Sequence, residues 1–94
     1  MAEELNLEEI RGQIDQLDQE ITKLICRRME ITKQVAAFKK ENGLPVYHPE
    51  REKKVIEKVS GLSGEEYGEA IAQIYQCIMD ESKKVQEKWL AEHK

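Results

Sequence analysis

The sequence predicts an all-α fold with three helices in each chain: a long one, a short one and another long one. Charged residues make up 36% of the 94 residues and aromatic residues only 5%, a composition typical of a solvated helical bundle. Apolar side chains recur at spacings of three and four, and the two-residue alternation typical of strands does not occur. We therefore expect residues 1–94 to form a single helical domain.

The first helix is expected over about residues 6–42. Asn6 is a suitable N-cap, with Glu9 three residues later, and Asn42-Gly43 provides a stop. One charged residue interrupts its apolar stripe, whose positions are Leu7, Ile10, Ile14, Leu17, Ile21, Leu24, Arg28, Ile31, Val35 and Phe38. A helix of about 35 residues is about 53 Å long, whereas a compact domain of this size has a radius of gyration of about 12 Å. The helix must overhang a monomer, so its stripe predicts a second copy of the chain in a homodimer.

The second helix is expected over about residues 49–60 and the third over about 64–91. Pro49 suits a first helical position, and glycines after the second helix break the pattern. Ser63 and Glu66 form a possible capping box for the third helix. The stripe of the third helix again contains one polar residue, and its positions are Ile71, Tyr75, Ile78, Ser82, Val85 and Trp89.

Charge and cysteine content exclude several classes of partner. The net charge of −4 gives no support for nucleic acid or a membrane surface as partner. No segment reaches the ~18 apolar residues of a membrane span, and the acidic N-terminus does not resemble a signal peptide, so we expect a cytoplasmic protein. Cys26 and Cys77 have no ligand partners at metal-site spacing, which favours free, partly buried thiols. We expect neither a metal nor a cofactor.

Three polar residues stand where the helical patterns require apolar ones. Arg28 breaks the first stripe, Ser82 breaks the third, and Glu52 opens the apolar face of the second helix. A guanidinium cannot lose its proton, so Arg28 needs an anion or a water-lined cavity. Simpler explanations exist: a register-fixing salt bridge for Arg28, close helix approach for Ser82, and a favourable dipole interaction for Glu52.

Other polar residues can join Arg28 in one site. Lys39 lies eleven residues further on, within about 20° of the same direction, so the two side chains could enclose a small ligand. Arg51 is a cation in a first turn, which opposes the helix dipole unless an anion is near. Gln86 shares a helix face with Ser82. Taken alone, Lys39 is equally explained as a solvated last-turn lysine and Gln86 as a surface amide.

Arg11 lies about 25 Å from Arg28 along the helix and about 100° around it. It cannot reach the same ligand within one chain, but in an antiparallel dimer it could reach the partner's site. A solvated helix arginine is the simpler explanation. The sequence holds no catalytic triad, paired carboxylates, glycine-rich phosphate loop or metal cluster, so the pattern favours a site that binds and orients a small dianion.

These positions resemble the all-helical, intertwined-dimer class of chorismate mutase. The resemblance extends from about Leu7 to Gln86. It rests on four segments: LEEIRGQIDQLDQEI with Arg11 and Asp18, RRMEITKQVAAFK with Arg28 and Lys39, LPVYHPERE with Arg51 and Glu52, and IMDESKKVQ with Ser82 and Gln86. It implies an intertwined homodimer that converts chorismate to prephenate by an intramolecular Claisen rearrangement, on the route to phenylalanine and tyrosine.

By this resemblance, Arg28 and Arg11 of the partner subunit bind the two carboxylates of the substrate, with help from Arg51 and Ser82. Arginine forks suit bidentate capture of carboxylates and fix the reactive conformer. The reaction is pericyclic, so the protein contributes restraint and electrostatics rather than covalent chemistry.

The resemblance also implies that Lys39 and Gln86 donate hydrogen bonds to the ether oxygen, where negative charge develops. Glu52 binds the ring hydroxyl, together with backbone near His48. The family often has an aspartate at that position; histidine is a poorer helix cap, which puts the start of the second helix in doubt. An exposed loop histidine is the simpler interpretation of His48.

Two other functions remain open from the sequence. An isochorismate-pyruvate lyase resembles the mutases in fold and pocket, but such lyases tend to have an apolar residue in place of Glu52. A non-catalytic dimeric helical module, such as a regulatory partner of a shikimate-pathway synthase, predicts no turnover with chorismate.

Overall fold

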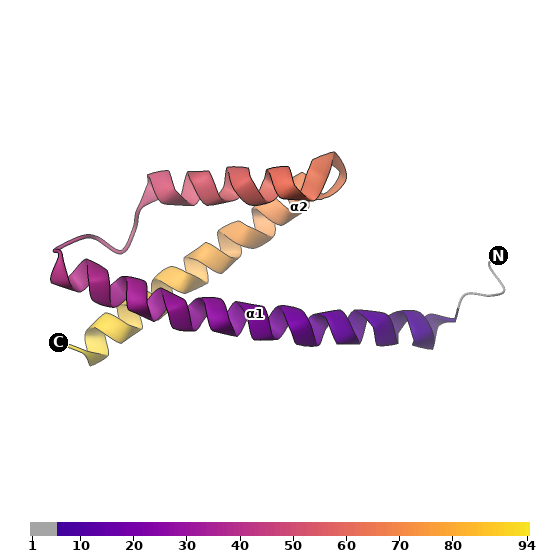
Figure 1. Ribbon diagram of the computed structural model, residues 1–94, viewed down its shortest axis with the longest axis horizontal. Coiled ribbons are helices and arrows are strands. Elements are labelled where there is room, and N and C mark those ends of the chain that lie inside the picture. The colour runs from indigo at the N-terminus through magenta and orange to yellow at the C-terminus, as the bar shows by residue number, and fades with distance from the viewer. Residues whose placement is uncertain (1–5) are drawn as a thin grey trace.

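The computed structural model describes residues 6–94, which form two helices joined by a short loop (Figure 1). Helix α1 spans Leu7–Glu41 and helix α2 spans Pro49–Glu92. No strand occurs within residues 6–94, so the all-α prediction is confirmed.

Both ends of α1 lie where the sequence predicts them. The side-chain oxygen of Asn6 accepts two backbone N–H groups of the first turn, at 2.9 and 3.3 Å. At the other end, the Asn42 backbone N–H donates to the Phe38 carbonyl at 3.1 Å. Gly43 follows with a φ of 64°, a left-handed conformation that glycine adopts without strain.

The predicted second and third helices are a single helix with a bend, so the structure has two helices rather than three. The bend is at Gly64, whose φ of 80° and ψ of 177° belong to a region that essentially only glycine occupies. Ser63 does not cap a new helix, because its hydroxyl donates to the carbonyl of Val59 within the preceding turn. The non-helical backbone at Gly64 lies within residues 61–64, where the sequence predicts a break in the helical pattern, but no loop separates the two parts of α2.

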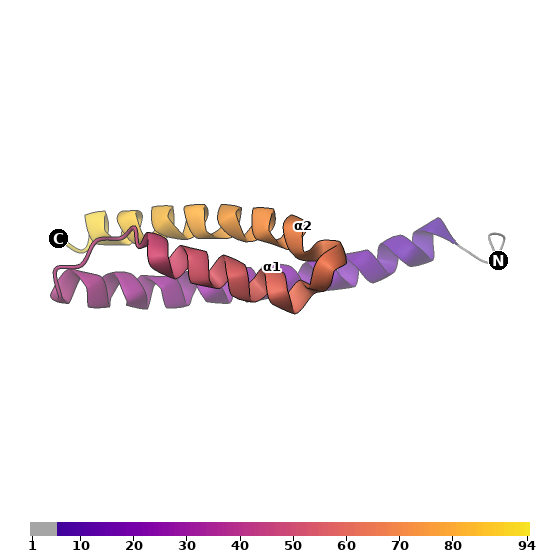
Figure 2. The ribbon, with the colours of Figure 1, turned by 90° about the horizontal axis from the view of Figure 1, so that it is seen from above.

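We call residues 49–63 the first limb of α2 and residues 65–92 the second limb. The first limb runs back alongside α1, and the second returns to the C-terminal end of α1 (Figures 1 and 2). Beside the bend, the Ser60 hydroxyl donates to the Gly68 carbonyl at 2.9 Å, and a Cβ at residue 68 would lie 3.2 Å from that hydroxyl. Gly68 therefore permits a close approach of the limbs. At the chain end, the Lys40 ammonium donates to the His93 carbonyl.

Helix α1 is longer than the part of it that α2 covers. Its N-terminal end extends beyond the bend of α2 (Figure 1). The radius of gyration is 17.4 Å, against about 12 Å for a compact domain of this length. The apolar stripe is consequently open to solvent in the single chain: Leu17 is 55% exposed and Leu24 is 67% exposed. The overhang expected from the helix length is present.

The buried apolar core is small. Among residues 6–94, the buried hydrophobic side chains are Ala36 on α1 and Val55 and Met79 on the two limbs of α2. They lie where the C-terminal half of α1 packs against α2, beside the buried polar residues Thr32, Ser82 and Gln86. This unusual mixture of buried polar and apolar groups marks the position of the site.

Candidate functional site

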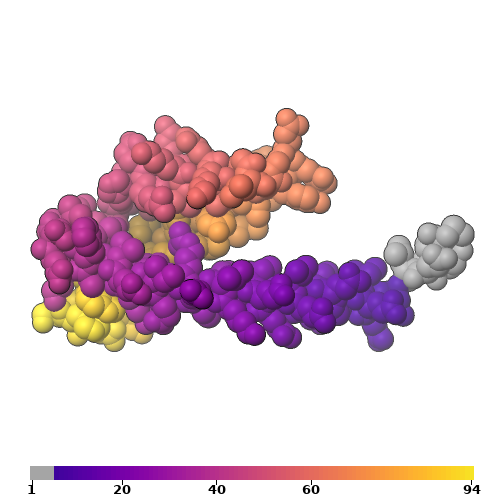
Figure 3. All heavy atoms as spheres, in the orientation of Figure 1, coloured from indigo at the N-terminus to yellow at the C-terminus, as the bar shows by residue number. Residues whose placement is uncertain are grey.

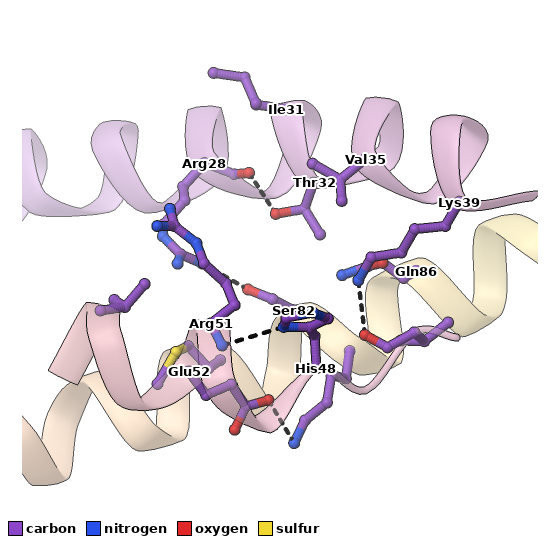
Figure 4. Close-up of a pocket in the computed structure, with 14 residues that line it drawn as sticks. Arg28, Ile31, Thr32, Val35, Lys39, His48, Arg51, Glu52, Ser82 and Gln86 are labelled. Atoms are coloured by element: carbon purple, nitrogen blue, oxygen red, sulfur yellow. Dashed lines mark hydrogen bonds and ion pairs between the residues drawn. The ribbon is translucent and has the colours of Figure 1, made fainter. Parts of the chain in front are cut away.

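A cavity of about 260 Å³ lies between the C-terminal half of α1, the loop and both limbs of α2. The space-filling view shows a hollow between α1 and the first limb of α2 (Figure 3), and Figure 4 shows side chains from all of these segments around the pocket. The lining residues are Arg28, Ile31, Thr32, Val35, Lys39, Val46, His48, Arg51, Glu52, Val55, Met79, Ser82, Lys83 and Gln86. Every site residue predicted from the sequence is among them except Arg11.

Arg28 and Ser82, the residues that break the two apolar stripes, contact each other. The Arg28 Nη1 donates to the Ser82 Oγ at 2.9 Å (Figure 4). The Ser82 hydroxyl donates its own proton to the Ile78 carbonyl at 2.7 Å. The guanidinium also lies 5.8 Å from the centre of the Tyr75 ring. None of the ion pairs within residues 6–94 involves Arg28, so Arg28 forms no register-fixing salt bridge within the described part of its own chain. Its remaining N–H groups can bind an anion in the cavity.

Lys39 reaches into the cavity from the last turn of α1. Its ammonium donates to the Val46 carbonyl of the loop at 2.7 Å (Figure 4). Burial lowers the pKa of Lys39 below its usual 10.5, because the charged form loses hydration, and the negative charge of Glu52 partly opposes this effect. Lys39 is thus a partly desolvated cation, whose interaction with an anion is stronger than it would be in water.

His48 and Arg51 form the start of α2. The His48 Nδ1 accepts the backbone N–H of Arg51 at 3.1 Å, so this histidine does cap the helix, contrary to the concern raised by the sequence. Pro49 occupies the first helical position, as expected. The Arg51 side chain remains available to the cavity, since no ion pair within residues 6–94 involves it.

Glu52 lies in the cavity wall between the two limbs of α2. Its Oε2 is 3.0 Å from the ammonium of Lys83, and its Oε1 is 3.4 Å from the Gln76 amide nitrogen. Lys83, one of two adjacent lysines in the sequence, was not among the predicted site residues. Its spacing from Met79 and Gln86, four and three residues, places it on their helix face and could have revealed it.

Thr32 is the other polar lining residue that the sequence interpretation missed. It is buried, and its hydroxyl donates to the Arg28 carbonyl at 2.8 Å (Figure 4). It lies four residues after Arg28 and seven before Lys39, so the same face of α1 carries all three. That spacing was the available signal.

Gln86 contributes a buried amide to the cavity wall. It is 7% exposed, and its Oε1 is buried without a hydrogen-bond partner among residues 6–94. A buried polar group without a partner is costly, which indicates a site prepared for a ligand. Because amide oxygen and nitrogen can exchange places by rotation, Gln86 can present an N–H to the same space.

Arg11 is not part of the cavity of its own chain. It is exposed on the overhanging half of α1, seventeen residues before Arg28, which corresponds to about 25 Å along the helix. The structure therefore places it far from the other predicted site residues.

The other expectations concern cysteines, metals and membranes. Cys26 and Cys77 are free thiols, and both are exposed rather than partly buried, because neither lies on the inner face of its helix. In the stretch from residue 6 to the C-terminus, no three His, Cys, Asp or Glu side chains gather closely enough to hold a metal ion. Neither helix of that stretch is long and apolar enough to span a membrane.

Comparison with known proteins identifies the family. The family "Chorismate mutase type II" matches residues 10–87. A chorismate mutase of Methanocaldococcus jannaschii is 38% identical over 88 residues, covering 92% of this chain and 89% of that protein. A bifunctional chorismate mutase/prephenate dehydratase of Aquifex aeolicus is 37% identical over 78 residues, 78% of this chain. This chain spans only 22% of the length of that bifunctional protein. The chain belongs to the chorismate mutase type II family.

Proposed function

We propose that this protein converts chorismate to prephenate in the cavity around Arg28 and Lys39, as one half of an intertwined homodimer. Residues 1–94 act as a single chorismate mutase domain on the route to phenylalanine and tyrosine. The observation that carries the proposal is the composition of the cavity: Arg28, Lys39 and Arg51, none of them in an ion pair within residues 6–94, and a buried amide surround a space of about 260 Å³.

The chemistry fits a site without a nucleophile. In the rearrangement an ether C–O bond breaks while a C–C bond forms within the same molecule, so no group on the protein needs to attack. The protein can accelerate such a reaction by holding the reactive conformer and by stabilising the charge that develops on the oxygen.

We assign the two substrate carboxylates to the arginines. Arg28 has a fixed orientation, because Ser82 accepts one of its N–H groups, and it retains further donors for a bidentate pair. Arg51 can approach from the start of α2. The Ser82 hydroxyl donates its proton to the Ile78 carbonyl, so we assign it the role of holding Arg28 rather than of donating to the substrate.

We assign the ether oxygen to Lys39 and Gln86. Lys39 must exchange its bond to the Val46 carbonyl for one to the substrate, and its partial desolvation strengthens that contact. Gln86 supplies an N–H by rotating its amide. An amide does not titrate, so we expect this contact to persist through neutral pH. A carboxylate in its place would have to be protonated.

Glu52 accepts the ring hydroxyl in this proposal, with backbone near His48 beside it. The carboxylate lies in the cavity wall, and each of its oxygens has room for more than one hydrogen-bond donor.

The homodimer and the role of Arg11 rest on the exposed stripe of α1. The chain exposes 7815 Å² of surface, against about 5,600 Å² for a compact monomer of its mass. A second copy that packs on the stripe in antiparallel orientation would cover Leu17 and Leu24 and bring its own Arg11 towards this chain's cavity.

The test is the loss of chorismate absorbance on addition of the purified protein, with prephenate identified as the product. Isochorismate is assayed in parallel. Release of pyruvate from isochorismate without conversion of chorismate would identify a lyase instead. No turnover of either substrate would favour the non-catalytic module.

A further inference from the structure

Lys83 lies in the wall of the cavity without a role in the proposed chemistry. It directly follows Ser82 on the second limb of α2, and it lines the cavity together with Glu52 on the first limb. The Lys83 ammonium is 3.0 Å from the Glu52 Oε2, and the side chains are only 23% and 16% exposed (Figure 4 marks the contact at Glu52). This ion pair is therefore more shielded than an ordinary surface pair.

Three groups from three segments hold the Lys83 ammonium in place. Glu52 belongs to the first limb, Asp80 on the second limb lies 3.3 Å away through its Oδ1, and the Tyr47 ring of the loop lies 4.6 Å away. Hydrogen bonds to Glu52 and Asp80 raise the pKa of Lys83 above its usual 10.5. The ammonium consequently stays charged at neutral pH and is oriented by its surroundings.

Glu52 interacts with two lysines of the cavity wall, Lys39 and Lys83. Its negative charge acts on Lys39, where it raises the pKa against the effect of burial, so the two groups are close enough to attract each other. A direct pair between them would occupy both groups that the reaction requires. The Lys83 ammonium and the Gln76 amide contact the two carboxylate oxygens of Glu52, at 3.0 and 3.4 Å, and so compete with Lys39 for this carboxylate.

We propose that Lys83 is a positioning residue of the active site, which holds the Glu52 carboxylate in the cavity wall and away from Lys39. Glu52 then remains free to accept the ring hydroxyl of the substrate, and Lys39 remains free to donate to the ether oxygen. This inference rests on the proposed function. A purely structural alternative is that the pair only fastens the two limbs of α2 to each other.

The experiment compares steady-state kinetics and thermal unfolding of Lys83→Met, Lys83→Arg and Lys84→Met with the wild-type dimer. Lys84 is a matched control, because it is the next residue, carries the same charge and pairs at 2.7 Å with Glu81 while 73% exposed. We expect Lys83→Met to lower kcat/KM about tenfold. Lys83→Arg is expected to restore activity to within about threefold of wild type, since it keeps the charge, and Lys84→Met to stay within about twofold.

Two further measurements separate positioning from mere fastening of the limbs. In a Glu52→Gln background, Lys83→Met should change kcat/KM by less than about twofold, because the carboxylate that it positions is gone. The second measurement uses a chorismate analogue that lacks the ring hydroxyl. With this analogue, the decrease in kcat/KM caused by Lys83→Met should be smaller than with chorismate, because Glu52 has no hydroxyl to bind.

The outcomes distinguish this inference from the proposed function. A wild-type protein that leaves chorismate unchanged overturns both. An active wild type in which Lys83→Met behaves like Lys84→Met overturns the positioning role alone. So does a full Lys83→Met penalty that persists in the Glu52→Gln background, since Lys83 would then act on the substrate without Glu52. Should Lys83→Met fail to fold, the same comparison is made with Lys83→Gln.

Discussion

Arg28 on α1 donates a 2.9 Å hydrogen bond to Ser82 on α2, 54 positions further along the chain. Each residue is the polar break in its own apolar stripe, and the fold brings the two breaks together. Ser82 is neutral, so it orients the guanidinium without cancelling its charge. The guanidinium therefore keeps its charge and further N–H donors for the cavity. This arrangement favours anion binding more than a salt bridge would.

Lys39→Ala is expected to lower kcat about 10²–10³-fold, because the substitution removes the charged donor assigned to the ether oxygen. Folding should suffer little, since the side chain makes one hydrogen bond to the loop, with a net value of about 1 kcal/mol. Lys33→Ala serves as a control, because Lys33 pairs with Glu30 on the surface of the same helix. Steady-state assays measure kcat and thermal melts measure stability. Near-normal turnover in Lys39→Ala would refute the assignment.

Activity is expected to fall in alkaline solution at a pH below 10.5. Burial lowers the pKa of Lys39, so its ammonium, the form that donates, is present at neutral pH and is lost as the pH rises through that lowered pKa. A bound dianion stabilises the ammonium, so the alkaline decrease of kcat should lie at higher pH than that of kcat/KM. In Lys39→Arg, any remaining activity should lack this decrease, because a guanidinium keeps its proton. A Lys39→Arg profile with the same alkaline decrease would assign it to another group.

Mixing two inactive variants should restore activity if the site is shared between subunits. Arg11→Ala and Arg28→Ala each damage both sites of their own homodimer. After co-refolding in equal amounts, half of the dimers contain one chain of each kind and hence one intact site, which predicts about a quarter of wild-type activity. Size-exclusion chromatography checks the oligomeric state. No recovery on mixing would contradict the assignment of Arg11 to the partner's cavity.

Gly64→Ala is expected to lower the free energy of unfolding by about 1–3 kcal/mol, because alanine is strained at a φ of 80° and a ψ of 177°. Gly61→Ala is the matched comparison. Gly61 is helical with open space around its Cα, so alanine there should stabilise the fold by about 0.5–1 kcal/mol. Denaturant melts at equal protein concentration measure both effects. Equal effects of the two substitutions would show that the bend does not depend on glycine.

The ends of α1 could be predicted because helix capping is a local property. Asn6 and Asn42-Gly43 act through residues within one turn, and the structure places the helix limits there. The boundary after residue 60 was predicted less well, because no local cap determines it. Ser63 resembles a cap in sequence, but its hydroxyl donates to the preceding turn, and the change in direction lies at Gly64.

The sequence predicted most of the polar residues that line the cavity, but it did not predict the contacts between them. The polar breaks and helical spacing indicated Arg28, Lys39, Ser82 and Gln86, because periodicity fixes which residues share a helix face. Lys83 escaped notice because a lysine beside another lysine is indistinguishable from surface charge until a carboxylate is placed opposite it.

By itself the sequence determined the helical class, the ends of α1 and an apolar stripe too long for a monomer, since all of these follow from local propensities and periodicity. The packing of the folded chain settled that α2 changes direction at Gly64, that Ser82 contacts Arg28, and that Glu52 pairs with Lys83. Those relationships depend on the angle at which the two limbs of α2 return to α1. A single glycine permits that angle, but long-range packing sets its value.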